Sequence, residues 1–366
     1  MARITISESQ VRRLAREVGQ ELIDQRDRKV SEYRHRQLAT RTEVIPEAVV
    51  VEIAGGRIRT RLADGGPGVH DAQNKEDKIA CLATLRGSTF TADPCPEPPQ
   101  GFTCPRRVQR LVAQMKGDAG EALAQEIAEQ SRDPASRSAR VCQEERGSPK
   151  RLVGTCVASM ETSVSFGPMM AAEACERGFY DARRRAFVAD GSAYNWSIHR
   201  GYFADFEPIT DFLHAVCYVY ASAHAVSVDE SSGWSQYLAW MGACWQGRVV
   251  DVLVELDRWQ ERLGEPPAED GSAEAGRDPR RVVHRTRTYL RNNQERMAYP
   301  RYRQAGLPTT SSLVESLVGE VNARVKSKQK YWTRGEGSES ILQLRAAVLS
   351  EDDRLRGYTG NRNSVR

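Results

Sequence analysis

Short apolar runs alternate with helical patterns between residues 151 and 211, and this alternation constrains the fold more than any other feature. An apolar run at 153–160 precedes a helical pattern, and a second run at 186–189 ends at Asp190. A further helix and a third short strand, which ends near Asp211, follow. Because strands that alternate with helices tend to pair in parallel, we expect an α/β core with a partly parallel sheet.

A second β signal lies nearer the N-terminus, in the stretch VVVEIAGGRIRTR at residues 49–61. β-Branched residues on both sides of Gly55-Gly56 predict a β-hairpin that turns at the two glycines. Residues 77–91 predict a third strand. Ala54 ends the first strand of this hairpin, at a place where enzymes often carry a reactive side chain. Alanine has none.

Helical patterns surround these strands. Residues 5–40 predict an amphipathic helix or a helix pair, which could bind DNA, contact a second copy or simply present a solvated face. Further helices are expected over 106–130, 212–263, 280–298, 313–325 and 339–355. The expected organisation is a helical N-terminal arm (1–45), an α/β core (46–211 and 300–356), a helical insertion (212–299) and a disordered tail (357–366).

Composition argues against a membrane protein and against a zinc protein. No apolar run approaches the roughly 18 residues that a membrane span needs, and the N-terminus lacks the apolar core of a signal peptide. A cytoplasmic protein is therefore expected. The eight cysteines include no C-x-x-C pair, which disfavours a closed zinc site. Most are expected in the core, although Cys95 and Cys104 could meet in a Pro-rich loop. The net charge of +4 is compatible with a nucleic-acid partner but is not specific for one.

Three features could carry chemistry, and each has a simpler structural explanation. Asp190 could lie where ligands bind at strand ends, or it could cap the next helix. Glu315 could be a ligand, or it could only stabilise the start of its helix. The basic run 324–334, with Tyr331 and Trp332 inside it, could neutralise phosphates and stack on bases, or it could be a solvated helix end.

Taken together, the three features match the layout of a two-metal phosphodiester site. One carboxylate lies on a central strand, another lies on a distant helix, and a helical insertion separates them. Such a site holds two cations about 3.5–4 Å apart, and Mg²⁺ (or Mn²⁺) requires oxygen ligands there. At least three carboxylates are needed to offset the charge, and the first normally comes from the first strand of the sheet.

Several motifs give this layout a specific counterpart: GGRIRTR, EDKIACL, FVADGSAYNW, DFLHA, LPTTSSLVES and NARVKSKQKYW…GSESILQLRAAVLSEDDRL. Through them, residues 48–356 resemble the DDE transposases of bacterial insertion sequences, most closely the ISKra group. The resemblance implies a ribonuclease-H-like mixed sheet flanked by helices, with a helical insertion before the last catalytic helix. It also implies Mg²⁺-dependent DNA cleavage and strand transfer, with double-stranded DNA and the element ends as partners of a homo-oligomer.

The resemblance also implies roles for single residues. Asp190 would be the second catalytic carboxylate and Glu315 the third, and both would bind metal. Asp211 and His214 match an Asp-x-x-His step that could support the site or the DNA ends, or could only pack. The residues implied to contact DNA are Arg324, Lys326, Lys328, Lys330 and Trp332.

The sequence departs from the family pattern at the first catalytic position. The family has Asp-Gly-Gly-Arg, whereas this chain has Ala54-Gly55-Gly56-Arg57, so cleavage is expected to be impaired. The chain could be a natural inactive or repurposed copy, or an engineered knockout. Glu52 could also substitute, although it lies about 6–7 Å back along the strand, and Asp64 and Asp71 are weaker substitutes.

The alternatives to an impaired transposase predict different products. A catalytically inactive DNA-binding derivative, such as a repressor or a domesticated copy, would bind DNA without cutting it. A nuclease of the same fold would cut without joining, and a plain helical interaction module would do neither. Relatives also carry a further N-terminal region, often metal-binding, and no Cys/His cluster precedes residue 48. A truncated copy is therefore one interpretation.

Overall fold

The computed structural model describes residues 6–61, 73–116, 147–267, 277–325, 332–333 and 336–357. Two compact units divide the chain. The first comprises Met1–Arg86, Lys150–Glu207 and Ser311–Arg366, and the second comprises Gly87–Pro149 and Pro208–Thr310. This division differs from the expected one, because residues 87–149 group with the helical unit and not with the sheet. The N-terminal arm groups with the sheet unit.

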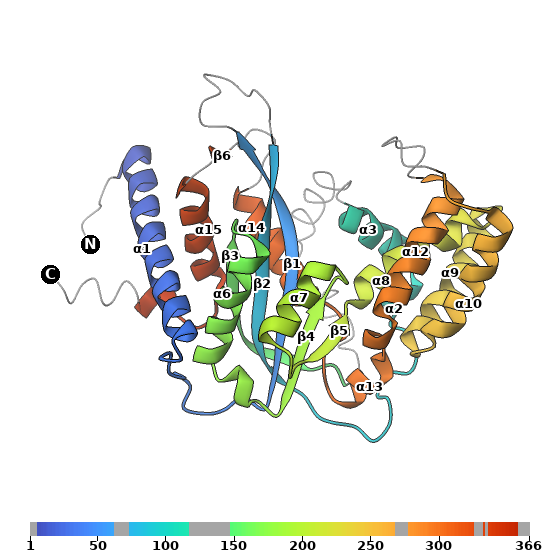
Figure 1. Ribbon diagram of the computed structural model, residues 1–366, viewed down its shortest axis with the longest axis horizontal. Helices are drawn as coiled ribbons and strands as arrows, with labels where there is room; N and C mark the ends of the chain where they lie inside the picture. Colours follow the sequence, from blue (N-terminus) through green and yellow to red (C-terminus); the bar gives the residue numbers. More distant parts are fainter. Residues whose placement is uncertain are drawn as a thin grey trace, which may run out of the picture. The chain divides into compact units, whose positions relative to one another are not determined.

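A mixed β-sheet is the main feature of the first unit, although the division assigns all of β5 except Glu207 to the second unit (Figure 1). Its strands are β1 Ala48–Arg61, β2 Gln73–Arg86, β3 Lys150–Ser159, β4 Arg184–Ala189, β5 Glu207–Thr210 and β6 Trp332–Thr333. The strand order is β3-β2-β1-β4-β5, and β6 pairs with β1. The β1–β2 and β2–β3 pairs are antiparallel, whereas β4 runs parallel to β1. The predicted α/β class with a partly parallel sheet is therefore confirmed.

The strand β1 does not turn at Gly55-Gly56, so the hairpin predicted at that pair is wrong. β1 continues unbroken through the glycines, and Gly56 pairs with Asp77 of β2. A Cβ atom on Gly56 would lie 2.6 Å from Asp77 Oδ1, and one on Gly55 would lie 2.9 Å from Glu76 Oε1. The two glycines thus make room for acidic side chains of the neighbouring strand, which is a known use of glycine inside strands.

The two faces of the sheet are covered by different helices. Val49, Val51 and Ile53 of β1 pack in a core with α6 (Ser163–Glu176) and with residues of α7 (Ala193–Tyr202). The short helix η1 (Phe179–Asp181) follows α6. Successive side chains of a strand project to opposite faces. Glu52 and Ala54 therefore face the other side, where α14 (Ser312–Val325) packs on β1 and β2.

The helix α15 (Glu336–Leu349) closes the open edge of β3 with polar side chains. Four side chains of α15 and of the turn after it bond alternate backbone groups of β3 and its end: Glu339 with Met160 N, Gln343 with Ala158 O, Ser350 with Cys156 N and Glu351 with Gly154 N. An exposed strand edge would otherwise be open to pairing with another chain. The stretch GSESILQLRAAVLSEDDRL therefore has a structural function in this fold.

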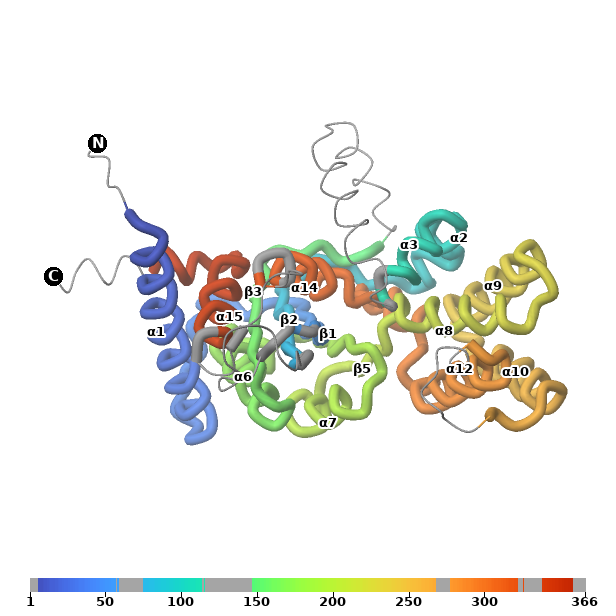
Figure 2. The backbone as a smooth tube through the Cα atoms, turned by 90° about the horizontal axis from the view of Figure 1, so that it is seen from above, coloured from blue at the N-terminus to red at the C-terminus, as the bar shows by residue number. Residues whose placement is uncertain are grey.

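The N-terminal arm is a single helix, α1 (Glu8–Arg34), and not a helix pair. It lies beside α15 in both views and also packs on α6 (Figures 1 and 2). Gly19 is its one buried residue, and a Cβ atom there would lie 2.2 Å from the carbonyl oxygen of Ser340. An ion pair of 2.5 Å between Arg26 and Glu339 adds to this contact. The close approach of two helix backbones fixes where α1 crosses α15.

We expect Gly19→Ala to lower the free energy of unfolding by about 1–3 kcal/mol, because the new methyl group has no space against the backbone of α15. This outcome runs against the helix propensity of alanine, which favours it over glycine by about 1 kcal/mol. The neighbouring exposed residue provides a control, since Gln20→Ala should stay within about 0.5 kcal/mol. Urea denaturation of both variants checks the prediction, and a stabilised Gly19→Ala protein would contradict it.

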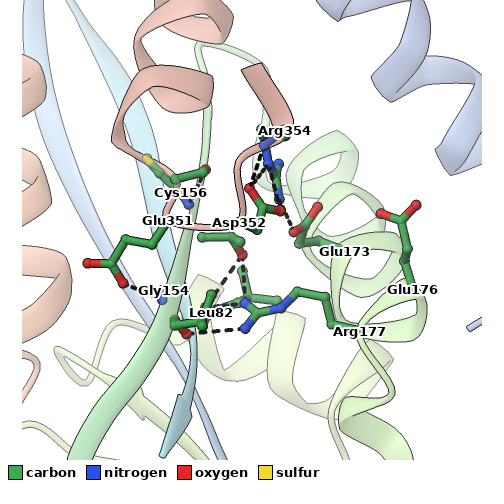
Figure 3. Close-up of polar contacts among 12 residues, drawn as sticks. Leu82, Gly154, Cys156, Glu173, Glu176, Arg177, Glu351, Asp352 and Arg354 are labelled. Atoms are coloured by element: carbon green, nitrogen blue, oxygen red, sulfur yellow. Dashed lines mark hydrogen bonds and ion pairs between the residues drawn. The ribbon is translucent and has the colours of Figure 1, made fainter. Parts of the chain in front are cut away.

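Charged side chains of α6, of Arg177 just after it and of the segment that follows α15 form a network (Figure 3). Glu173 of α6 is 3% exposed and accepts a hydrogen bond from Arg354, and its carboxylate lies 3.2 Å from Lys29 Nζ. Arg177 donates to the carbonyl oxygen of Leu82. These charges line a cavity of about 1310 Å³ in the first unit. The network joins α1, α6 and the C-terminal segment to the sheet.

The second unit is helical. Its elements are α2 Gln100–Thr103, α3 Pro105–Lys116, α8 Phe212–Ala225, α9 Glu230–Trp245, α10 Val249–Leu263, α12 Pro279–Asn293, η2 Gln294–Arg296 and α13 Tyr299–Gln304. An aromatic cluster forms its core: the rings of Phe102, Trp245 and Tyr299 each lie 4.9–5.0 Å from the ring of Phe212. The expected helices over 212–263 and near 280–298 are thus present.

Two expectations from composition can be compared with the described residues. No helix among them is long and apolar enough to cross a membrane. The seven described cysteines are free thiols. Only Cys81, Cys156 and Cys244 are buried and the other four are partly exposed, so the expectation that most lie in the core is not met among the described residues. Cys95 and Cys104 do not form a disulfide.

Candidate metal and nucleic-acid site

The parallel pairing of β1 with β4 places two of the singled-out positions next to each other. Ile53 of β1 is the register partner of Ala189 of β4, so the residues that follow them, Ala54 and Asp190, lie side by side. Register partners on neighbouring strands project to the same face of a sheet. Ala54 is 6% exposed. Ala54, which has no carboxylate, therefore comes next to Asp190, which has one, where the paired part of β1 and β4 ends.

Three hydrogen bonds orient the carboxylate of Asp190. Its Oδ1 accepts from the backbone N–H of Ser192 and from Nδ2 of Asn195, both at 2.8 Å, and its Oδ2 accepts from the hydroxyl of Ser192 at 2.9 Å. Asn195 is fully buried in α7. Gly191 has a φ of +94°, a conformation that glycine adopts at little cost. The local sequence DGSAYN thus builds a turn that holds this carboxylate at the end of β4.

Glu315 lies in the first turn of α14, on the face of the sheet that also carries Ala54. The backbone N–H of Glu315 donates to Ser311 O at 3.0 Å, so the intrahelical bonding begins at Ser311. Its side chain is half-buried. The preceding residue, Val314, is fully buried and donates its N–H to Glu52 Oε2 at 2.9 Å. The helix start is therefore attached directly to β1.

Sequence reasoning missed the contribution of β2. Asp77 is fully buried and lies against Gly56, on the same face as Ala54. On the other face, Glu76 accepts from Lys78 Nζ at 3.2 Å and from the hydroxyl of Tyr194 at 3.3 Å. Two signals were present in the sequence, the acidic pair Glu76-Asp77 of EDKIACL and the pair Gly55-Gly56. Their relation is visible only once the register of β1 with β2 is known.

Acidic side chains lie near Tyr194 of α7. Burial raises the pKa of the Tyr194 hydroxyl above its ordinary value of 10, and the charges of Asp190 and Glu76 raise it further. Tyr194 therefore stays protonated and can act as a hydrogen-bond donor beside the carboxylates. Lys78, whose Nζ lies 5.9 Å from the centre of the Tyr194 ring, supplies a positive charge near the same side chain.

The donor set can be tested against the divalent cations that the resemblance implies. Asp190 and Glu315 offer hard oxygen donors of the kind that Mg²⁺ prefers, whereas Ala54 offers none. Within the described ranges, no group of three or more His, Cys, Asp or Glu side chains is arranged to hold a metal ion. The residues present do not fit a pair of Mg²⁺ ions, and alanine at position 54, which the resemblance implies as the first ligand position, supplies no donor.

Asp211 and His214 contact each other in the second unit. Asp211 is fully buried and precedes α8, where its Oδ1 accepts from the N–H of Leu213 at 3.1 Å. Its Oδ2 lies 2.7 Å from His214 Nδ1. The Asp-x-x-His step is therefore a helix cap that holds an imidazole.

The residues implied to contact DNA fall largely outside the described part of the chain. Lys326, Lys328 and Lys330 lie outside it. Arg324 belongs to α14, and Trp332 belongs to β6, whose backbone pairs with β1 at Thr60. Of the substitutes considered for position 54, Glu52 is bonded to the start of α14, and Asp64 and Asp71 lie outside the described residues.

Comparisons with known proteins assign no function to the site. No protein-family model matches the chain, and no curated protein is significantly similar to it.

Proposed function

We propose that this chain is a ribonuclease-H-like protein of the DDE transposase type whose DNA cleavage is impaired at position 54. The observation that carries the proposal is the parallel register of β1 with β4, in which Ala54 and Asp190 directly follow the paired residues Ile53 and Ala189. The helix α14, which has Glu315 in its first turn, packs on β1. The three positions Ala54, Asp190 and Glu315 come from distant parts of the sequence. They are the three positions that the resemblance to insertion-sequence transposases implies.

The strand order supports the ribonuclease-H-like fold. Strands β1, β2 and β3 form an antiparallel meander, and the chain then returns through α6 to place β4 parallel to β1 on its other side. The central strand β1 carries position 54, and its parallel neighbour β4 ends at Asp190. Ligands of α/β sheets bind at the carboxyl ends of parallel strands. Asp190 directly follows β4, and Ala54 directly follows the part of β1 that pairs in parallel with β4.

The proposed substrate is double-stranded DNA, including the element ends, bound by a homo-oligomer. In this proposal Asp190, held by Ser192 and Asn195, and Glu315 remain as oxygen donors. Phosphate contacts would come from Arg324 and from the lysines that follow it. Bound Mg²⁺ would supply Lewis-acid chemistry to phosphodiester cleavage, but the residues as they stand do not complete its site.

The main alternative is a catalytically inactive DNA-binding derivative, such as a repressor or a domesticated copy. Ala54 favours this alternative, because alanine in place of the family's aspartate removes a ligand, whereas the strand β1 and its register with β4 are kept. Such a protein would bind duplex DNA with an affinity that falls about 10³–10⁵-fold between about 50 and 200 mM salt, if it neutralises about 6–10 phosphates. It would show no cleavage after repair of position 54.

We expect Ala54→Asp to nick supercoiled plasmid in Mn²⁺ at least about tenfold faster than the unchanged chain, a difference of about 1.4 kcal/mol in activation free energy. The reason is that the change restores an oxygen donor beside Asp190. The matched control is the double variant Ala54→Asp/Glu315→Ala, which should return to background. If Ala54→Asp binds DNA but does not nick it, the inactive derivative becomes the better account. Nicking by the unchanged chain would show that another carboxylate completes the site.

A further inference from the structure

Glu52 is a buried carboxylate at the centre of the sheet. It is fully buried in β1, within a run of buried residues that extends from Ala48 to Ala54. Its register partner on β2 is Cys81, which is also fully buried. A charge in such a place costs much free energy unless hydrogen bonds or opposite charges offset the loss of water. A position of this kind needs a specific structural reason.

The start of α14 supplies that reason. Glu52 Oε2 accepts the backbone N–H of Val314 at 2.9 Å, although the two residues are 262 positions apart in sequence. The first N–H groups of a helix have no partner inside the helix, and the helix dipole makes this end positive. A carboxylate that accepts such an N–H is favoured by both effects. Glu52 thus performs from a neighbouring strand the task that a capping side chain performs locally.

This contact controls the position of Glu315, because Val314 is the residue immediately before it. Glu52 and Ala54 are two residues apart on β1, so they share the face that α14 covers. We propose that Glu52 is a positioning residue, which fixes the first turn of α14 and thereby holds Glu315 over position 54 and Asp190. The proposal rests on the proposed function for its catalytic meaning, but the attachment of the helix can be measured by itself.

A positioning role explains Glu52 better than substitution for the missing ligand. Its Oε2 faces a backbone N–H of α14, and a two-residue step along a strand is about 6–7 Å. A positioning carboxylate can be replaced by glutamine, whose carbonyl oxygen still accepts the N–H of Val314. If Glu52 were a metal ligand, glutamine in its place would weaken metal binding, because the negative charge disappears.

The first test is hydrogen exchange at the start of α14, measured on the unchanged chain and on Glu52→Gln, Glu52→Leu and Thr155→Val. Thr155 is a buried polar residue of β3 that contacts Arg177 and serves as the matched control. We expect the Val314 amide to exchange at least tenfold faster in Glu52→Leu, and Glu52→Gln to restore most of the protection. Thr155→Val should leave this amide protected. Unchanged exchange in Glu52→Leu would overturn the proposal.

The second test repeats the Glu52 changes in the Ala54→Asp background and measures plasmid nicking in Mn²⁺. We expect Glu52→Leu to lower the nicking rate at least tenfold and Glu52→Gln to recover most of the loss. An equal loss in both variants would overturn positioning and indicate a ligand role. If Ala54→Asp itself fails to nick, the proposed function is rejected, while the exchange experiment still decides whether Glu52 holds α14.

Discussion

Glu173→Gln is expected to lower the free energy of unfolding by about 3 kcal/mol, the lower end of the range for breaking a buried ion pair. The change keeps the size of the side chain but removes the negative charge that Arg354 and Lys29 face. Glu173 is buried, whereas the side chains of Arg354 and Lys29 are 26% and 24% exposed, and their access to water moderates the loss. Urea denaturation at pH 7 measures the difference.

Acid should remove the same stabilisation from the unchanged chain. Burial alone would raise the pKa of the Glu173 carboxyl, but the charges of Arg354 and Lys29 outweigh it and hold the pKa well below its ordinary value of 4.5. Below that value the unfolded chain binds a proton that the folded chain does not. The contribution of Glu173 is therefore fully present above about pH 5 and is lost progressively as the pH falls.

The Glu173→Gln protein lacks this titration, so its stability should fall less steeply between about pH 5 and pH 3 than that of the unchanged chain. Glu17→Gln serves as the control, because Glu17 pairs with Arg13 at an exposed helix surface and should change stability by under about 0.5 kcal/mol. Parallel acid slopes for the unchanged chain and Glu173→Gln would mean that other carboxylates account for the acid sensitivity.

The predictable parts of the fold were those with a local signal. The run that ends at Asp190 is a short apolar stretch followed by Gly191 and a helix, and the structure places a strand, a turn and α7 there. The helix that carries Glu315 likewise follows from its apolar spacing. These two elements carry Asp190 and Glu315, so the local sequence patterns gave the element type at both positions, while the roles of the two carboxylates stay predictions.

The parts that failed depend on contacts between distant residues. Gly55-Gly56 looks like a turn, but the glycines lie inside a strand because Glu76 and Asp77 occupy the space beside them. The bond between Glu52 and Val314 joins residues far apart in the chain, and no local pattern reveals it. The edge contacts of α15 with β3 are nonlocal in the same way. Register, more than element type, is what the sequence alone did not provide.

The second large effect is expected in the helical unit, where Arg303→Met should lower the free energy of unfolding by about 3 kcal/mol. Arg303 is 5% exposed and forms a forked pair with Asp93, with Nε at 2.8 Å from Oδ1 and Nη2 at 2.5 Å from Oδ2. Its guanidinium also lies 4.0 Å from the centre of the Trp245 ring. Methionine fills part of the volume but leaves the carboxylate of Asp93, only 14% exposed, without its cation.

The geometry of this pair also predicts that lysine cannot replace the arginine. Burial raises the pKa of Asp93, but the hydrogen bonds from Arg303 outweigh it and lower the pKa below its ordinary value of 3.8. Because a lysine ammonium cannot reproduce the planar fork or the stacking on Trp245, Arg303→Lys should recover less than half of the loss. The exposed pair of Arg248 with Asp251 gives the control, and Arg248→Met should change stability by less than about 0.5 kcal/mol. Full recovery by lysine would show that charge alone, and not the fork, stabilises this contact.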